Sequence, residues 1–167
     1  MRNIDLAYLN NGTGFIIMGA NTDDALGGGS IAVGDINKDG FGDVLIGVPN
    51  VSPMGRSTAG GGYLIFGGAS MPNIDLANLK NYAGFNISGA NAGDKAGTAV
   101  SIVDINKDGF GDIIISAPYA SPLNRGSAGI ISVIYGKSTG FTDIDLNSFS
   151  STQGFFIFGQ TSGSNVG

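Results

Sequence analysis

Two identical nine-residue segments hold the side chains of this sequence that are best suited to chemistry. Each reads Asp-Ile-Asn-Lys-Asp-Gly-Phe-Gly-Asp, first at residues 35–43 and again at 104–112. Side-chain oxygens stand at the first, third, fifth and ninth positions, and the backbone carbonyl of the seventh can add another oxygen. Calcium takes about six to eight oxygen ligands, and alternate residues of a tightly turning loop can aim their oxygens at one centre. The sequence therefore predicts a calcium site in each segment, with water completing the coordination.

The predicted ligands form the same set in both loops. Gly40, at the sixth position of the first loop, permits the sharp turn with a positive φ. Two bound divalent cations would also neutralise most of the net charge of −5. The ligands are Asp35, Asn37, Asp39, the Phe41 carbonyl and Asp43 in the first loop, and Asp104, Asn106, Asp108, the Phe110 carbonyl and Asp112 in the second.

Three other interpretations of these segments are weaker. An EF-hand needs a bidentate Glu at its twelfth position between two helices, whereas Ile46 or Ile115 stands there within a predicted strand. Magnesium prefers a small octahedral shell that retains several waters, so a loop offering five protein oxygens favours calcium. Asp, Asn and Gly also crowd ordinary turns. Turn chemistry alone does not explain the letter-for-letter recurrence, because other loops of the chain have diverged.

Composition excludes several classes of enzyme. The chain has no Cys, His or Trp, and all 13 acidic residues are Asp. These absences remove Ser-His-Asp and Cys-His nucleophiles, zinc sites built on His or Cys, and any glutamate general acid. Without Cys, the redox compartment is not determined.

Charge and hydropathy limit the partners. Only eight Lys and Arg residues are scattered along a chain of net charge −5, so a nucleic-acid partner is not expected. No apolar run approaches the roughly 18 residues that span a bilayer, so membrane insertion is not expected either. The opening MRNIDLAYLN lacks the apolar stretch of a signal peptide.

The whole chain repeats itself with a period of about 70 residues. NIDLAYLN at 3–10 recurs as NIDLANLK at 73–80 and, more loosely, as DIDLNSFS at 143–150. Short apolar runs rich in Ile, Val, Phe and Tyr alternate with clusters of Gly, Asn, Asp, Ser and Pro, which is the pattern of strands and turns. We therefore predict strands at 14–19, 29–34, 43–48, 62–66, 84–88, 98–103, 112–117, 129–135 and 154–158.

Four strands in each repeat, joined by compact turns, predict an all-β fold of β-propeller blades, each a four-stranded antiparallel sheet. The sequence holds two full blades and an extra outer strand. We place the outer strand at 1–20, blade one at about 21–90, blade two at about 91–160 and a tail at 161–167.

The order of these elements resembles the FG-GAP repeat of integrin α-subunit propellers. An apolar strand, the Asp-x-Asn-x-Asp-Gly-x-x-Asp loop, a second strand and a small residue before proline follow one another, as in that repeat. The residues that carry the resemblance beyond the loops are Ala117 and Pro118, with Val48 and Pro49 in the first copy, and Phe66 and Gly67, echoed by Tyr135 and Gly136. The resemblance implies an integrin-α-like β-propeller with calcium between the first and second strands of each blade. It also implies an extracellular or cell-surface location.

Such propellers are similar in having seven blades, and two blades do not close a ring. The chain is therefore expected either to come from a longer array or to complete a propeller as a homo-oligomer. In the second case the surplus strand at 14–19 would pair in another chain.

Three functions are carried forward from the sequence. The first is a noncatalytic calcium-binding module whose variable loops bind a protein or a glycan. Arg56 and Arg125 stand at equivalent points of two loops, and a solvated loop charge explains them better than a ligand contact does. The second is a self-assembling scaffold whose chains jointly complete a propeller. The third is an Asp-dependent hydrolase, for which Asp143 and Asp145 are the candidate carboxylate pair.

Overall fold

The computed structural model describes residues 9, 14–22 and 24–167, and within these residues the chain forms strands, turns and single 3-10 turns but no α-helix. β-branched and aromatic residues fill the strands, and Gly, Asn, Asp and Pro separate them. In chain order the elements are β1 (Ile17–Met18), β2 (Ile31–Gly34), β3 (Asp43–Gly47), η2 (Pro53–Gly55), β4 (Gly61–Ile65), β5 (Ile74–Asp75), η3 (Leu76–Asn78), β6 (Gly84–Ser88), β7 (Val100–Val103), β8 (Asp112–Ala117), η4 (Pro122–Asn124), β9 (Ile130–Ile134), β10 (Ile144–Asp145), η5 (Leu146–Ser148) and β11 (Gly154–Phe158).

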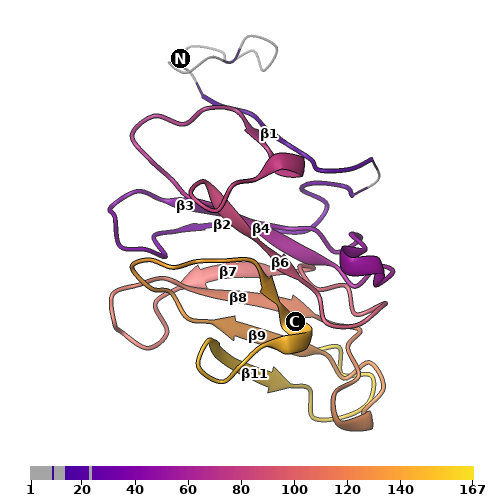
Figure 1. Cartoon of the computed structure of the whole chain (residues 1–167). Helices are drawn as coiled ribbons and strands as arrows, with labels where there is room; N and C mark the ends of the chain where they lie inside the picture. Colours follow the sequence, from indigo (N-terminus) through magenta and orange to yellow (C-terminus); the bar gives the residue numbers. More distant parts are fainter. Residues whose placement is uncertain (1–8, 10–13, 23) are drawn as a thin grey trace, which may run out of the picture.

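Two antiparallel sheets with the same strand order form the body of the molecule (Figure 1). Strands β2, β3, β4 and β6 are the antiparallel strands of the first sheet, and we call them blade one. Strands β7, β8, β9 and β11 make the second sheet, blade two. This arrangement confirms the predicted all-β fold of four-stranded blades. The blades are two neighbouring blades of a β-propeller.

The extra outer strand is shorter than predicted. Of the predicted strand 14–19, only Ile17–Met18 forms β1, and it pairs in parallel with β5 of the same chain. β10 pairs in parallel with β6 in the same way. Pairing of the strand 14–19 in another chain stays a prediction. Part of the predicted outer segment 1–20 lies outside the described residues, and the blade boundaries stay predictions.

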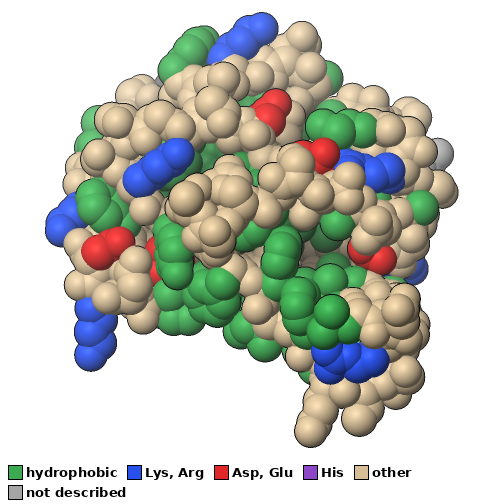
Figure 2. Space-filling view, turned by 60° about the horizontal axis from the view of Figure 1, so that its bottom comes forward, with side chains coloured by type: hydrophobic (Ala, Val, Ile, Leu, Met, Phe, Trp, Pro, Cys, Tyr) green, Lys and Arg blue, Asp and Glu red, His purple; other side chains and the backbone are tan. Residues whose placement is uncertain are grey.

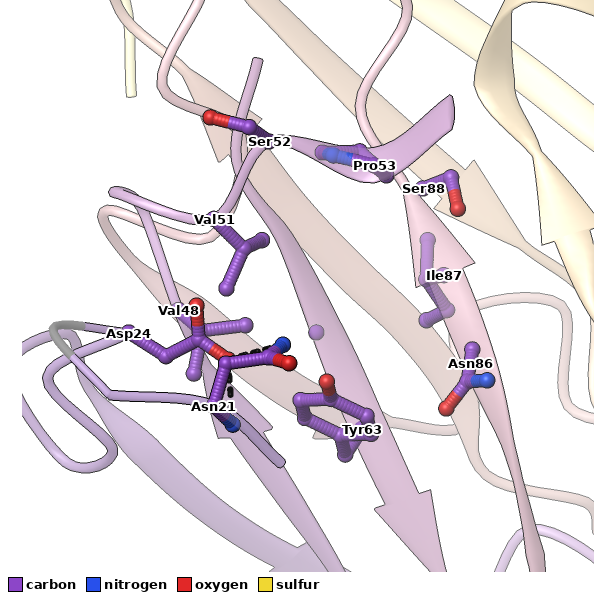
Figure 3. A pocket seen from close by; sticks show the side chains of 11 residues that line it. Asn21, Asp24, Val48, Val51, Ser52, Pro53, Tyr63, Asn86, Ile87 and Ser88 are labelled. Carbon is purple, nitrogen blue, oxygen red and sulfur yellow. Dashed lines mark hydrogen bonds between the residues drawn. The ribbon is translucent and has the colours of Figure 1, made fainter. Parts of the chain in front are cut away.

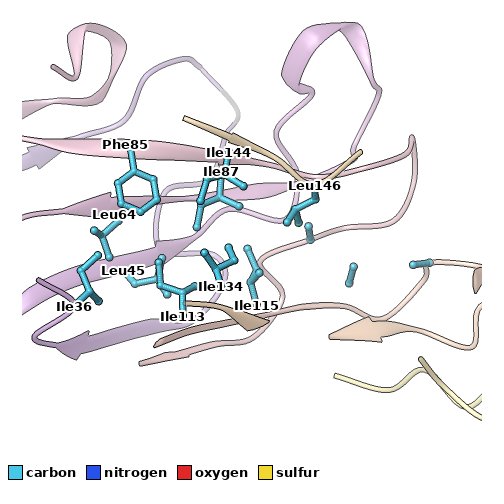
Figure 4. Packing of buried hydrophobic residues seen from close by; sticks show 13 residues of the cluster. Ile36, Leu45, Leu64, Phe85, Ile87, Ile113, Ile115, Ile134, Ile144 and Leu146 are labelled. Atoms are coloured by element: carbon cyan, nitrogen blue, oxygen red, sulfur yellow. The ribbon is translucent and has the colours of Figure 1, made fainter. Parts of the chain in front are cut away.

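The main apolar core lies between the two blades (Figure 4). Leu45, Leu64 and Phe85 of blade one pack with Ile113 and Ile134 of blade two, and all five side chains are buried. Burying such side chains contributes about 1.5–3 kcal/mol each.

Glycine allows the two sheets to approach closely. A Cβ atom added at Gly47 in blade one would collide with the carbonyl oxygen of Gly97, which precedes blade two. The Gly97 amide in turn donates to the Ser116 carbonyl at 2.8 Å. The high glycine content therefore serves backbone contact between blades as well as turns.

In the described part of the chain, no helix has the length and apolar character needed to span a membrane.

Candidate metal centre

The two predicted calcium loops connect the first and second strands of their blades. Gly34 stands opposite Asp43 in the β2–β3 hairpin, and Val103 stands opposite Asp112 in the β7–β8 hairpin. Each hairpin therefore ends in a loop that begins and finishes at an Asp. Hairpin pairing fixes the two ends of the loop side by side.

Two residues of each loop adopt the left-handed backbone region. Gly40 has a φ of 87°, as the sequence predicts, and Lys38 has a φ of 60°. The second loop repeats both values closely, with 91° at Gly109 and 62° at Lys107. A left-handed Lys costs about 1–2 kcal/mol. The contacts of the loop must therefore offset this cost, and the sequence gives no sign that Lys takes this conformation.

Side-chain oxygens of the first loop gather around the backbone amides at its tip. The Asp39 amide donates both to Asp35 Oδ1 at 3.1 Å and to Asn37 Oδ1 at 3.0 Å. The Gly40 amide donates to Asp35 Oδ2 at 2.9 Å, and the Phe41 amide donates to Asp39 Oδ1 at 2.8 Å. Asp35 and Asn37 thus share one donor, which places their oxygens near each other.

The second loop has the same hydrogen bonds with almost the same lengths. The Asp108 amide donates to Asp104 Oδ1 at 3.1 Å and to Asn106 Oδ1 at 3.0 Å. The Gly109 amide donates to Asp104 Oδ2 at 2.9 Å, and the Phe110 amide donates to Asp108 Oδ1 at 2.8 Å. Identical segments thus fold identically in the two blades, so any cation that fits one loop fits the other.

The ninth-position Asp of each loop is buried and holds the base of the loop together. Asp43 is 0% exposed, and its carboxylate accepts from the Ile36 amide at 2.8 Å and from the Gly67 amide at 2.8 Å. Asp112, also 0% exposed, accepts from the Ile105 and Gly136 amides at 2.9 Å each. This structural role is not visible in the sequence pattern, which presents both residues only as ligands.

Burial raises the pKa of the Asp43 carboxyl above its usual value, and the nearby negative charges of Asp39 and Asp35 raise it further. Hydrogen bonds from the Gly67 and Ile36 amides partly oppose this rise. Three carboxylates therefore repel one another across this loop. A bound cation would relieve that repulsion.

Each loop offers the carboxylate, amide and carbonyl oxygens that calcium prefers as ligands. Its carboxylates, however, do not lie around one point. In residues 9, 14–22 and 24–167, no three Asp side chains lie close enough together to hold one metal ion. Each carboxylate oxygen has two lone pairs, so an oxygen that accepts an amide hydrogen can also contact a cation. Joint ligation by the five predicted donors of each loop stays a prediction.

The structure also brings the two loops into contact with each other. The Gly111 amide of the second loop donates to the Asp35 carbonyl at 2.8 Å. Lys38 Nζ lies 3.4 Å from the Asp108 carbonyl and 5.3 Å from the centre of the Phe110 ring. These contacts follow from the stacking of the blades, so no motif within one repeat could have indicated them.

Other candidate functional residues have structural partners. Arg56 forms a salt bridge of 2.9 Å with Asp145, so its charge is paired within the chain. Burial opposes ionisation of Asp145, but the Arg56 hydrogen bond and the Asn147 amide outweigh it and lower the pKa of the carboxyl. Asp143 accepts from the Asn86 amide at 2.9 Å. The proposed carboxylate pair thus joins the two blades.

A cavity of about 150 Å³ at the edge of blade one contains a single carboxylate (Figure 3). Tyr63 and Asn86 face it from neighbouring strands, and Asp24 lies on the opposite side. Asp24 accepts from the backbone and side-chain amides of Asn21 at 3.1 and 2.9 Å. A hydrolase of the kind considered above needs several carboxylates outside the calcium loops, so this cavity does not support one.

Comparison with known proteins identifies the repeats. The sequence profile of the FG-GAP repeat matches residues 27–65 and 96–134, and each match spans one of the two loops. Bovine phosphatidylinositol-glycan-specific phospholipase D is 33% identical over 114 residues, which are 68% of this chain and 14% of that protein. Integrin alpha pat-2 of Caenorhabditis elegans is 32% identical over 127 residues, covering 70% of this chain and 10% of that protein. Mouse integrin alpha-3 is 35% identical over 96 residues, which are 55% of this chain and 8% of that protein.

The chain thus spans only about one seventh or less of the length of these relatives. The profile matches, the similarity to integrin α chains and the two stacked four-stranded blades agree with one another. The chain belongs to the FG-GAP repeat family of integrin-α-like β-propellers, and it carries two copies of the repeat.

Proposed function

We propose that this chain is a noncatalytic module in which each of two loops binds a calcium ion and so stabilises its blade. The observation that supports the proposal is the duplicated loop. Three oxygen-bearing side chains form the same hydrogen bonds at the tip of both copies, and a buried Asp at the ninth position holds the base of each loop. Calcium would supply the positive charge that offsets the repulsion among these carboxylates.

The ligand that we propose for the assembled module is a protein or a glycan, bound by the variable loops of a propeller face. Similarity to integrin alpha chains supports this part of the proposal, as it does an extracellular or cell-surface location. The phospholipase activity named for other relatives is not carried over, because the matched region is 14% of the bovine protein.

Calorimetric titration of metal-free protein with calcium tests the proposal. We expect saturable binding of two ions per chain at up to millimolar calcium. Magnesium should bind more weakly, because it retains several waters, whereas each loop offers five protein oxygens. No heat change at millimolar calcium would refute the proposal.

A self-assembling scaffold is the second candidate function. Phe155 and Ile157 of β11 are 38% and 44% exposed on the last strand of blade two. Apolar residues exposed on an outer strand favour contact with another chain. Light scattering that gives a mass near 16.8 kDa at all concentrations would rule out assembly.

A further inference from the structure

A cavity of about 230 Å³ lies between the two blades, at the end of the strands away from the calcium loops. β8 shows this direction, because it runs from Asp112 in the second calcium loop to Ala117 in the cavity wall. Residues of blade one, of blade two and of the segments between them line the cavity, and most of them are apolar: Ala90, Ala96, Ile130, Leu146, Phe156 and Phe158. Both walls thus belong to the described part of this chain.

One buried carboxylate lies in this apolar lining. Asp94 is 6% exposed, and its Oδ2 accepts from the backbone and side-chain amides of Asn91 at 3.2 and 3.1 Å. Within the described residues, no hydrogen bond or salt bridge reaches Asp94 Oδ1. Burial raises the pKa of the Asp94 carboxyl, and the bonds from Asn91 oppose only part of this rise. A buried charge is costly until its partners are complete, so Oδ1 can accept from a ligand.

A wider groove adjoins the cavity at Asp94, which lines both. Lys95 lies on one side of the groove and Tyr119 on the other, with the Lys95 Nζ 5.4 Å from the centre of the Tyr119 ring. The Gly93 and Lys95 amides donate to carbonyls of blade one, those of Ser57 and Thr58, at 2.9 and 3.2 Å. The groove thus presents ammonium, hydroxyl, amide and aromatic groups on an anchored backbone.

The residues that shape the cavity and the groove are not common to the two repeats. The counterparts of Phe156, Phe158, Lys95 and Tyr119 one repeat earlier are Asn86, Ser88, Ala25 and Asn50. Blades stack with either set of residues, so stacking alone does not account for an aromatic wall at this junction. Hydrophobic side chains also reach the surface at the blade-two end of the molecule, in a hollow between polar lobes (Figure 2).

The chemistry of the cavity and groove fits a neutral sugar. A charged ligand would meet a like charge, either the Asp94 carboxylate or the Lys95 ammonium, whereas a sugar hydroxyl both donates and accepts. A pyranose ring whose hydroxyls are all equatorial has only C–H groups on its two faces, and such a face packs well on an aromatic ring. The cavity is smaller than the roughly 300–1,000 Å³ pockets of drug-sized ligands, so it suits a single ring.

We propose that the cavity and the groove bind a β-linked glucan, with one pyranose ring in the cavity and the next ring in the groove. A hydroxyl of the first ring donates to Asp94 Oδ1, and its apolar face packs on the stacked rings of Phe156 and Phe158, whose centres are 5.9 Å apart. The second ring contacts Tyr119. This inference rests on the proposed function, because it names the class of glycan and the place where the module binds it. The site contains no residue of the calcium loops.

Cellobiose, which is two β-linked glucose rings, is the probe, and amide NMR of the full chain measures its binding. We expect saturable shifts at residues 90–96 and 117–132, and none with glycerol, which has hydroxyls but no ring. Asp94→Asn keeps the size of the side chain but removes its charge. It is expected to weaken binding about ten-fold, which corresponds to about 1.4 kcal/mol, because a hydrogen bond to a charged group contributes at least that much.

Asp24→Asn is the matched control for this variant. Asp24 accepts the same two hydrogen bonds from Asn21 but lies outside the cavity and the groove. The control should bind cellobiose as the wild type does, which separates loss of the ligand contact from loss of the turn.

A second variant tests the groove without changing the turn that Asp94 closes. Tyr119 is 50% exposed, so Tyr119→Ala should leave the fold intact. It is expected to weaken cellobiose binding roughly three-fold or more, and to leave binding of methyl β-D-glucopyranoside unchanged, because only a second ring reaches the groove.

Three results would overturn the sugar site. They are the absence of saturable shifts up to the solubility limit of cellobiose, shifts that fall outside the two ranges, and wild-type binding by both Asp94→Asn and Tyr119→Ala. The titration is run in calcium and in chelator, so its outcome is separate from that of the calorimetry. A chain that binds two calcium ions but no cellobiose refutes only the sugar site, and a chain that binds cellobiose but no calcium refutes only the calcium proposal.

Discussion

Saturating calcium is expected to raise the melting temperature of this chain by roughly 10–20 °C. A ligand at 100 times its dissociation constant stabilises the folded state by about 2.7 kcal/mol for each site. In a chain of this length each kcal/mol shifts the melting temperature by about 2–4 °C. Two loops with the same hydrogen bonds should contribute equally.

Variants of one loop at a time show how much each site contributes to the rise in melting temperature. Asp39→Ala or Asp108→Ala removes the fifth-position carboxylate of one loop, so each single variant should keep about half of the calcium-dependent shift. The double variant should lose it. Differential scanning calorimetry in calcium and in chelator measures these shifts.

Asp24→Asn is the control, because it also removes a negative charge but lies outside both loops. Its calcium-dependent shift should equal that of the wild type. A wild-type shift of less than about 3 °C, or a double variant that responds as fully as the wild type, would contradict calcium binding in the loops.

Asp43→Asn is expected to destabilise the chain by about 3 kcal/mol even in chelator. Both oxygens of the buried carboxylate accept backbone amides, those of Ile36 and Gly67. Asn offers one oxygen and turns an NH₂ group toward the other amide. A buried donor without a partner costs about 1–3 kcal/mol, and the close approach of two donors adds to that cost.

The corresponding substitution in blade two tests the same structural role. Asp112→Asn should have a similar effect, since Asp112 is equally buried and makes the corresponding two bonds. Asp39→Asn, at an exposed position, should change the free energy of unfolding by less than about 1 kcal/mol in chelator. Urea unfolding measures the free energy of unfolding of all three variants. If Asp43→Asn is as stable as the wild type without metal, the carboxylate does not hold the base of the loop.

Strand positions and loop hairpins could be predicted from the sequence because their signals are local. Apolar runs such as residues 43–47 and 112–117 are bounded by Gly, Asp and Pro, and the duplicated loop marks the turn between the first two strands. The repeat of about 70 residues also showed which residues of the two blades correspond. Composition alone was enough to remove the common nucleophiles and zinc sites.

Features that depend on contact between blades could not be predicted in this way. β5 and β10 are two residues long, too short for an alternating pattern, and they form only because an outer strand lies beside them. The Arg56–Asp145 salt bridge joins residues from successive repeats, so each residue taken alone looked like a surface charge or a catalytic candidate. Burial of Asp43 likewise depends on Gly67 at the end of the third strand.

Anomalous diffraction from crystals grown in millimolar calcium tests the central claim most directly. The account predicts one calcium peak in each loop, about 2.3–2.6 Å from the oxygens of the first, third, fifth, seventh and ninth residues. Loops that carry no anomalous peak, with Asp35, Asp39 and Asp43 bonded only to backbone amides at that calcium concentration, would contradict it.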